Sequence, residues 1–242
     1  MSDSKTMIVR LFGPGLSDVS TFVRGLSRDG EDIPICWDEH PEVVVKCTGP
    51  RIVSDLCARY GQAVYTFEGR SMESVVGAHL AAGGLTLSVA ESCTGGLLGQ
   101  MLTSVPGASN FFAGGVIAYS NQLKVSLLGV PDDVIDRHGA VSEPVVLAMA
   151  AGMRRHGRTD VAVSVSGVAG PGGGSIEKPV GTLWFGLATP DGVRGVEQFF
   201  KGNRAEIRRA AAIFALDLVR RWCIGRGGNP MVFEVAGQSV MN

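Results

Sequence analysis

Short apolar runs rich in β-branched residues alternate with segments of helical period along most of this sequence, and several runs end directly in glycine-rich polar turns. The clearest run is Leu85–Ala90 (LTLSVA), which leads without a spacer into ESCTGG and then into a helical pattern from Gly96. Strands that alternate with helices form layered α/β folds. The sequence therefore predicts a three-layer α/β/α domain with a mixed sheet over residues 70–224.

The other elements of this region follow from the same patterns. Gly83-Gly84 ends a helix that begins near Ser71, and Asp191-Gly192 is typical of a hairpin turn between two strands, which makes the sheet mixed. The remaining expectations are strands at 116–119, 161–166, 181–189 and 192–200, a helix at 145–155 capped by Ser142, and a helix at 204–222 capped by Asn203.

Residues 1–69 carry a smaller pattern of their own. A strand at 6–11 ends at Gly13-Pro14-Gly15, and apolar residues then recur at helical spacing from Leu16 to Leu26. We expect a small α+β domain of order βαββαβ, and we leave residues 225–242 unassigned because they show no clear period. Its later elements are strands at 33–37 and 42–47, a helix at 52–60 and a short apolar run at 63–67.

The composition excludes several classes of protein. The 22 basic residues nearly balance the 23 acidic ones, so a nucleic-acid surface is not indicated. No apolar stretch is long enough to span a bilayer, and the start MSDSKT does not resemble a signal peptide. The five cysteines form no C-x-x-C pair, which favours reduced thiols and a cytoplasmic location without membrane contact.

The turn after Leu85–Ala90 is the first candidate for chemistry. It places Ser92, Cys93 and Thr94 between the end of a strand and the start of a helix, where open α/β sheets bind ligands and helix N–H groups stabilise anions. Such a turn suits a nucleophile, although an ordinary capped turn explains the same residues equally well.

Two further segments follow strands in the same way. Ser166–Ser175 (SGVAGPGGGS) either cradles a ligand or is a flexible connection, since it has neither the Walker pattern nor G-x-G-x-x-G. Tyr119-Ser120-Asn121 precedes Lys124, and helical spacing would turn Ser120 and Lys124 to one face. A desolvated lysine can act as the base for a serine, whereas a solvated surface lysine is the commoner case.

The remaining charged residues give weaker signals. Arg204 opens the last long helix, where it could meet a phosphate or carboxylate or simply be solvated. The four histidines show no metal-ligand spacing and no acidic cluster accompanies them, so we expect no metal and no cofactor.

Taken together, AESCTGG, PGAS, AYSNQLK, LLGV, HGAVSE, SGVAGPGGG and EKPVGT resemble, in this order, the CinA C-terminal domain family over about residues 71–222. That family includes nicotinamide-nucleotide amidases. The resemblance implies hydrolysis of nicotinamide mononucleotide to nicotinate mononucleotide and ammonia by a metal-free Ser-Lys mechanism. It favours Ser92 over the neighbouring Cys93 as nucleophile.

The resemblance also implies roles for particular residues. Ser92 would attack the carboxamide carbon, Lys124 would take its proton and Tyr119 would assist or position. Ser166, where the family often has threonine, and Arg204 would complete the catalytic set. The residues implied in binding the mononucleotide are Thr94, Gly95, Gly96, Asn121, Gly167, Ala169, Gly170, Gly172 and Gly173.

The first 69 residues resemble the KH-like middle region of full-length CinA proteins, without the nucleotide-hydrolase domain that usually precedes it. They contain no G-x-x-G clamp, so we do not expect nucleic acid as a partner. The expected partners are the small-molecule substrate and a second copy of the chain in a homodimer. Two alternatives stay open, namely a catalytically silent nucleotide-binding module and a competence or damage-inducible adaptor protein.

Overall fold

The computed structural model describes residues 6–26 and 34–225, which divide into two compact units. The first unit holds the described residues up to Val75, and the second those from Val76. The division falls within α3 (Met72–Ala82). Within the described ranges, no helix combines the length and apolar character needed to cross a membrane.

The first unit is a four-stranded antiparallel sheet with two helices, in the expected order βαββαβ. The strand order is β2-β3-β1-β4. The strand expected at 33–37 is found at 35–39, and Ile33 lies outside the described residues. The elements are β1 (Thr6–Phe12), α1 (Leu16–Leu26), β2 (Ile35–Glu39), β3 (Glu42–Thr48), α2 (Pro50–Tyr60) and β4 (Val64–Thr66).

The core of this unit is formed by apolar residues that alternate along the strands and recur at helical spacing in the helices. Val9 and Leu11 of β1 and Val43 and Val45 of β3 point to one face of the sheet, because side chains two residues apart share a face. Apolar residues of both helices pack against them, among them Val19 of α1. The periods read from the sequence are therefore those that form the core.

The second unit has a five-stranded mixed sheet of order β6-β5-β7-β8-β9. β5 runs parallel to β6 and β7, whereas β8 runs antiparallel to β7 and β9. After α3, its elements are β5 (Leu87–Glu91), α4 (Leu97–Thr103), β6 (Phe112–Ile117), α5 (Asn121–Leu128), α6 (Asp132–His138), α7 (Glu143–Gly157), β7 (Val161–Gly167), β8 (Thr182–Thr189), β9 (Gly192–Phe199) and α8 (Arg204–Gly225).

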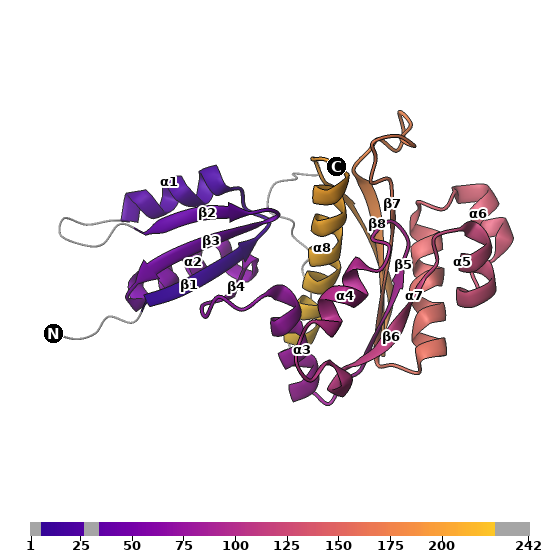
Figure 1. The fold of residues 1–242 in the computed structure, drawn as a ribbon, viewed down its shortest axis with the longest axis horizontal. Helices are drawn as coiled ribbons and strands as arrows, with labels where there is room; N and C mark the ends of the chain where they lie inside the picture. The colour runs from indigo at the N-terminus through magenta and orange to yellow at the C-terminus, as the bar shows by residue number, and fades with distance from the viewer. Residues whose placement is uncertain (1–5, 27–33, 226–242) are drawn as a thin grey trace. The chain divides into compact units, whose positions relative to one another are not determined.

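Helices cover both faces of this sheet. α7 packs on one face with α5 and α6 beyond it, and α4 and α8 pack together on the other face (Figure 1). The expected three-layer α/β/α architecture with a mixed sheet is confirmed.

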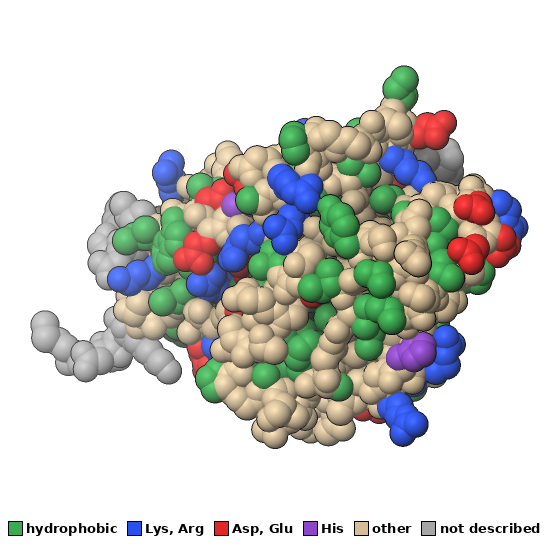
Figure 2. All heavy atoms as spheres, turned by 45° about the vertical axis from the view of Figure 1, so that its right-hand side comes forward, with side chains coloured by type: hydrophobic (Ala, Val, Ile, Leu, Met, Phe, Trp, Pro, Cys, Tyr) green, Lys and Arg blue, Asp and Glu red, His purple; other side chains and the backbone are tan. Residues whose placement is uncertain are grey.

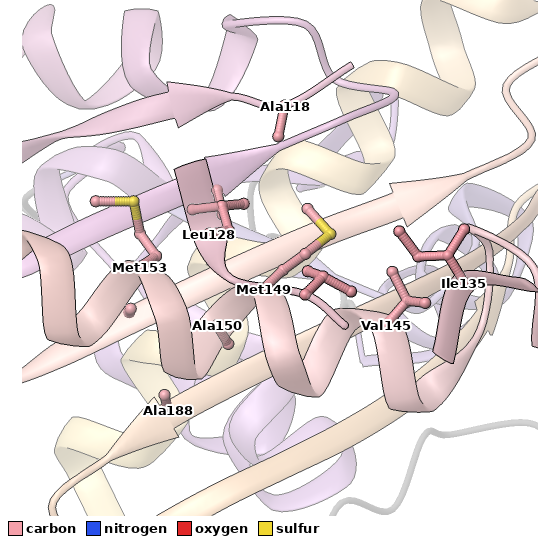
Figure 3. Packing of buried hydrophobic residues seen from close by; sticks show 11 residues of the cluster. Ala118, Leu128, Ile135, Val145, Met149, Ala150, Met153 and Ala188 are labelled. Atoms are coloured by element: carbon pink, nitrogen blue, oxygen red, sulfur yellow. The ribbon is translucent and has the colours of Figure 1, made fainter. Parts of the chain in front are cut away.

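α7 lies unusually close to its neighbours. Met149 and Met153 pack among Leu128, Ala188 and other small apolar residues (Figure 3). A Cβ on Gly152 would lie 1.8 Å from the carbonyl oxygen of Leu128, so only glycine allows α7 to approach α5 at this point. This contact fixes α5 against the layer, and α5 carries Lys124.

Two elements differ from the sequence prediction. The strand expected at 116–119 is β6, which begins at Phe112 and ends at Ile117, before Tyr119. The start of β6 was not predicted because it contains Gly114 and Gly115, and glycine is a poor strand former. A Cβ on Gly115 would lie 2.8 Å from the carbonyl oxygen of Val89, so the close approach to β5 requires glycine.

The helix α6 was not predicted. It has seven residues, and three of them are aspartates, which leave little apolar period to recognise. Figure 2 shows acidic side chains gathered at the right-hand end of the visible face, where α6 lies. The short helix is thus an exposed acidic element.

The two predicted helix caps have different outcomes. Asn203 Oδ1 accepts hydrogen bonds from the N–H groups of Ala205 and Glu206, so this cap is confirmed. Ser142 precedes α7 as expected, but its hydroxyl donates to the carbonyl oxygen of Gly139 at 2.8 Å and does not cap the helix. The side-chain cap at Ser142 was therefore wrong, because the preceding turn takes up the hydroxyl.

Candidate functional site

The sheet topology gathers the candidate segments at one edge. Since β5, β6 and β7 are parallel, their carboxyl ends meet there, and β9, antiparallel to β8, also ends there and leads into α8. The turn after β5, the residues after β6, the loop after β7 and the start of α8 thus share an edge. This is the usual ligand position in an open α/β sheet.

Ser92 and Lys124 meet at this edge of the sheet. Lys124 Nζ lies 3.2 Å from Ser92 Oγ, within hydrogen-bond distance, although 32 positions separate the residues in the sequence. Ser92 directly follows β5, and its N–H donates to the carbonyl oxygen of Val165 on β7, which holds the start of the turn against the sheet. The sequence predicted the two residues but not their distance.

Lys124 is held inside the protein. Its side chain is 1% exposed, and Nζ donates to the carbonyl oxygens of Ala118 at 2.9 Å and Tyr119 at 3.2 Å. Burial lowers the pKa of Lys124, because the charged ammonium loses its hydration. A buried lysine with a lowered pKa beside a hydroxyl can act as a base, so the solvated alternative is excluded.

Cys93 is a poor rival for Ser92. Burial raises the pKa of the Cys93 thiol to about 12, so the thiol is protonated at neutral pH. The neutral thiol is a weak nucleophile. It also provides no negative charge to raise the pKa of Lys124, which leaves burial as the dominant effect on that lysine.

Glu91 occupies the helix terminus that the sequence offered to an anion. Its buried carboxylate accepts hydrogen bonds from the N–H groups of Gly96 and Leu98 at 2.9 and 3.1 Å, and from Gly99 at 2.8 Å. The expectation that free N–H groups at the start of α4 bind a ligand anion was therefore wrong. The chain fills this position with a carboxylate of its own.

Arg208 braces the same turn from α8 and was missed in the sequence. Its Nε donates to the carbonyl oxygen of Cys93 at 3.1 Å, and Nη2 donates to that of Thr94. Gly95 adopts a φ of +58°, and a Cβ there would lie 3.3 Å from Arg208 Nη2. One signal was present, because Arg208 lies four residues after Arg204 and so on the same helix face.

Thr94 is also enclosed. It is fully buried, and its Oγ1 has no hydrogen-bond partner among the residues that the structure describes. Buried hydroxyls are usually hydrogen-bonded, so this group calls for an explanation. It is the second residue after Ser92.

The three residues of the Tyr119–Asn121 segment lie in different surroundings. Tyr119 is 60% exposed, and its hydroxyl accepts a hydrogen bond of 3.4 Å from Arg204 Nη2. The Ser120 hydroxyl accepts from the N–H of Leu123 and caps α5, while Asn121 begins that helix and is exposed. The expectation that Ser120 and Lys124 face the same way was wrong, because Lys124 points inward.

The loop after β7 is tied to the site through Arg204. Arg204 Nη1 donates to the carbonyl oxygen of Gly170 at 2.6 Å. Gly167 is half-buried and Ala169 and Gly170 are buried, whereas Gly172 and Gly173 are exposed. Arg204 thus joins this loop to Tyr119.

Ser166 is hydrogen-bonded to the segment that precedes α7. It is buried, and its hydroxyl donates to the carbonyl oxygen of Ala140 at 2.8 Å. This contact joins β7 to the segment before α7. No side-chain hydrogen bond joins Ser166 to Ser92 or Lys124 in the described part of the chain.

Over residues 6–26 and 34–225, no three His, Cys, Asp or Glu side chains are placed to share a metal ion. Directly at Ser92, the described residues bring together a hydroxyl and a buried amine.

The second unit is thus a mixed-sheet α/β protein in which parallel strands bring a buried lysine onto a serine hydroxyl. The family model described as "CinA C-terminal domain" matches residues 69–223. The chain belongs to the CinA C-terminal domain family, and the match leaves the small N-terminal unit as an additional domain.

Several curated relatives extend the likeness. A "CinA-like protein" of Anaeromyxobacter sp. (strain Fw109-5) is 46% identical over 189 residues, which cover 74% of this chain and 46% of that protein. Another, from Desulfotalea psychrophila, is 39% identical over 230 residues, or 90% of this chain and 55% of the relative. The chain spans about half the length of the curated relatives it matches.

Solved structures agree with the fold. A competence-damaged protein (CinA) superfamily protein from Klebsiella pneumoniae 700603 is 31% identical with a TM-score of 0.62, covering 63% of this chain and 96% of that one. Competence/damage inducible protein CihA from Agrobacterium tumefaciens is 36% identical with a TM-score of 0.58, covering 62% and 94%.

Proposed function

We propose that this protein hydrolyses the carboxamide of nicotinamide mononucleotide to nicotinate mononucleotide and ammonia, with Ser92 as nucleophile and Lys124 as general base. The observation that carries the proposal is the 3.2 Å distance between Lys124 Nζ and Ser92 Oγ, with a lysine that burial makes easier to deprotonate. Membership of the CinA C-terminal domain family supports it.

The surroundings of Lys124 suit a neutral amine. Its two N–H hydrogens can be donated to the carbonyl oxygens of Ala118 and Tyr119, which leaves the lone pair for the hydroxyl of Ser92. In this arrangement Ser92 O–H donates to Lys124 Nζ. The hydrogen bonds orient the base as well as holding it in place.

The reaction then proceeds in two halves. Ser92 Oγ attacks the carboxamide carbon as its proton moves to Lys124, and a tetrahedral oxyanion forms. The Lys124 ammonium returns that proton to the departing nitrogen, and ammonia leaves an ester on Ser92. Water attacks the ester with Lys124 again as base, which releases the carboxylate product and restores the hydroxyl of Ser92.

The oxyanion needs donors other than those of α4, because Glu91 occupies the N–H groups of Gly96, Leu98 and Gly99. We assign this role to the N–H groups that directly follow the nucleophile, those of Cys93 and Thr94. Arg208 holds the carbonyl oxygens of both residues and so fixes the direction of the turn.

Tyr119 and Arg204 suit the two ends of a pyridine mononucleotide. The pyridinium ring of nicotinamide mononucleotide is a cation, and the exposed ring of Tyr119 offers it an aromatic face. The Arg204 guanidinium, held between Tyr119 and Gly170, suits the phosphate. Thr94, Gly95, Asn121 and residues 167–173 remain the proposed lining of the substrate.

The test is ammonia release from nicotinamide mononucleotide by the purified full chain. The wild type should release ammonia, Ser92→Ala should lose turnover while it still binds the nucleotide, and Ser126→Ala, on the exposed side of α5, should retain activity. Binding by the folded wild type without turnover would instead favour a catalytically silent nucleotide-binding module.

The adaptor alternative requires a different experiment. Several relatives carry names such as "Putative competence-damage inducible protein", which describe those proteins. A protein partner retained by Ser92→Ala but dependent on the first 69 residues would support an adaptor function for this chain. The homodimer and the cytoplasmic location stay predictions, as does the absence of a nucleic-acid partner.

A further inference from the structure

A pocket lies at the other end of the strands of this sheet from Ser92. It has a volume of about 300 Å³ and forms where α7 ends. Thr159, which lines it, precedes β7, whereas the candidate active-site loop follows β7. The pocket is therefore at the opposite edge of the sheet from Ser92.

Three arginines line this pocket, namely Arg154, Arg155 and Arg158. No carboxylate is among its lining residues. Arg154 Nε donates to the backbone carbonyl oxygen of Asp160 at 2.9 Å. The nearby Asp160 carboxylate accepts two hydrogen bonds from Thr86, both of 2.8 Å, and these bonds lower its pKa. Both of these bonds go to Oδ2, and the charge of the neighbouring Arg154 also lowers the pKa of Asp160.

Arg158 has an unusual backbone. It is the only non-glycine residue with a positive φ in the described part of the chain, at 50°. Gly129 occupies the equivalent left-handed position at the end of α5, as expected where a side chain is disfavoured. A strained residue that keeps a long cationic side chain points to a function for that side chain.

The simpler explanation covers only part of this arrangement. Arginines in the last turn of a helix interact favourably with its carbonyl end, which accounts for Arg154 and Arg155. It does not account for Arg158, where glycine would end the helix without strain. Nor does it explain why three arginines line one hollow, although Arg155 Nη2 also lies 3.2 Å from the position that a Cβ on Gly129 would take.

We propose that this pocket binds a small phosphate-bearing molecule. Guanidinium groups match phosphate oxygens in two-pronged hydrogen bonds, and three of them suit a group that carries more than one negative charge. The Thr159 hydroxyl is engaged with Ser88 and Val161, so the arginines supply the recognition. The volume fits a small ligand. This inference is independent of the proposed amidase activity.

Calorimetric titration of the full chain with inorganic pyrophosphate tests the site. The wild type should bind, and Arg155→Gln and Arg158→Gly should each weaken binding by about tenfold or more, the loss expected for one charged hydrogen bond. Arg137→Gln, on α6 outside the pocket, should bind as the wild type does. Arg204→Gln, at the candidate active site, should also retain this binding.

Arg158→Gly separates binding from folding. Because glycine relieves the positive φ, its thermal midpoint should equal or exceed that of the wild type while its affinity for pyrophosphate falls. Failure of the wild type to bind pyrophosphate would overturn the proposal. So would wild-type affinity in both pocket variants, or loss of binding in Arg204→Gln alone. Binding of an oligonucleotide but not of pyrophosphate would overturn it too.

Discussion

Replacing Glu91 by glutamine tests whether the turn that carries Ser92 depends on a buried carboxylate. In the wild type, Oε2 accepts from the N–H groups of Gly96 and Leu98, and Oε1 accepts from that of Gly99. The amide of the variant has only one oxygen. In its better orientation it still accepts from Gly96 and Leu98 but turns an NH₂ group toward the N–H of Gly99.

The expected loss of stability follows from these three contacts. Two hydrogen bonds change from charged to neutral, at about 1 kcal/mol each, and one buried donor is left without an acceptor, at about 1–3 kcal/mol. The free energy of unfolding should therefore fall by about 3–5 kcal/mol. At about 2–4 °C per kcal/mol, the thermal midpoint should fall by about 6–20 °C.

Scanning calorimetry of Glu91→Gln beside Glu197→Gln measures this effect. Glu197 is exposed on β9, so its variant should stay within about 0.5 kcal/mol of the wild type. A loss below about 1 kcal/mol in Glu91→Gln would mean that the start of α4 does not depend on this carboxylate.

Three other variants test the base, the turn that carries Ser92 and the packing of α7. Lys124→Met should lower kcat/KM by about 10²–10⁴-fold, the usual contribution of a general base, and Lys46→Met on β3 should not. Since only the neutral amine can take the proton, wild-type activity should rise with pH and level off below the ordinary lysine pKa of about 10.4; a midpoint at or above that value would contradict the buried base. Arg208→Lys should lower kcat by about tenfold or more with little change in KM, because it misdirects the turn and does not touch substrate; equal effects on both would contradict a positioning role. Gly152→Ala should destabilise by about 1–3 kcal/mol in urea unfolding, because its Cβ would strike Leu128, whereas Gly25→Ala in α1 meets nothing and should not destabilise.

The layers of the second unit could be predicted from the sequence because its apolar runs coincide with the strands that are buried in the sheet. β5 and β7 are apolar and β-branched and lie inside the sheet, so their runs were plain in the sequence. β6 was placed too late, since its glycines are required by a close approach to β5 that no local pattern reveals. The acidic helix α6 lacked a readable apolar face.

The candidate site was predicted as a set of residues but not as a geometry. Ser92 and Lys124 stood out because each follows a strand, and the parallel pairing of β5 with β6 then brings them together. Glu91 and Arg208 were missed. Glu91 appeared to be only a polar residue at a strand end, and the contact from Arg208 to Cys93 spans 115 positions along the chain.

The anion site was misplaced for a related reason. A glycine-rich turn before a helix indicates free N–H groups, yet the acceptor that fills them here comes from the preceding strand. The local sequence pattern indicated the N–H donors at the start of α4. Only the fold showed that they donate to the Glu91 carboxylate. Arg204, already a candidate for a phosphate or carboxylate in the sequence, stays the proposed phosphate contact.

The central claim is that Ser92 and Lys124 together hydrolyse an amide of a pyridine mononucleotide. Its most direct measurement is single-turnover ammonia release from nicotinamide mononucleotide by the wild type, Ser92→Ala and Ser126→Ala. The wild type and Ser126→Ala should release ammonia, whereas Ser92→Ala should release none while it remains folded and binds the nucleotide. Release by Ser92→Ala at the wild-type rate, or none by the folded wild type, would contradict it.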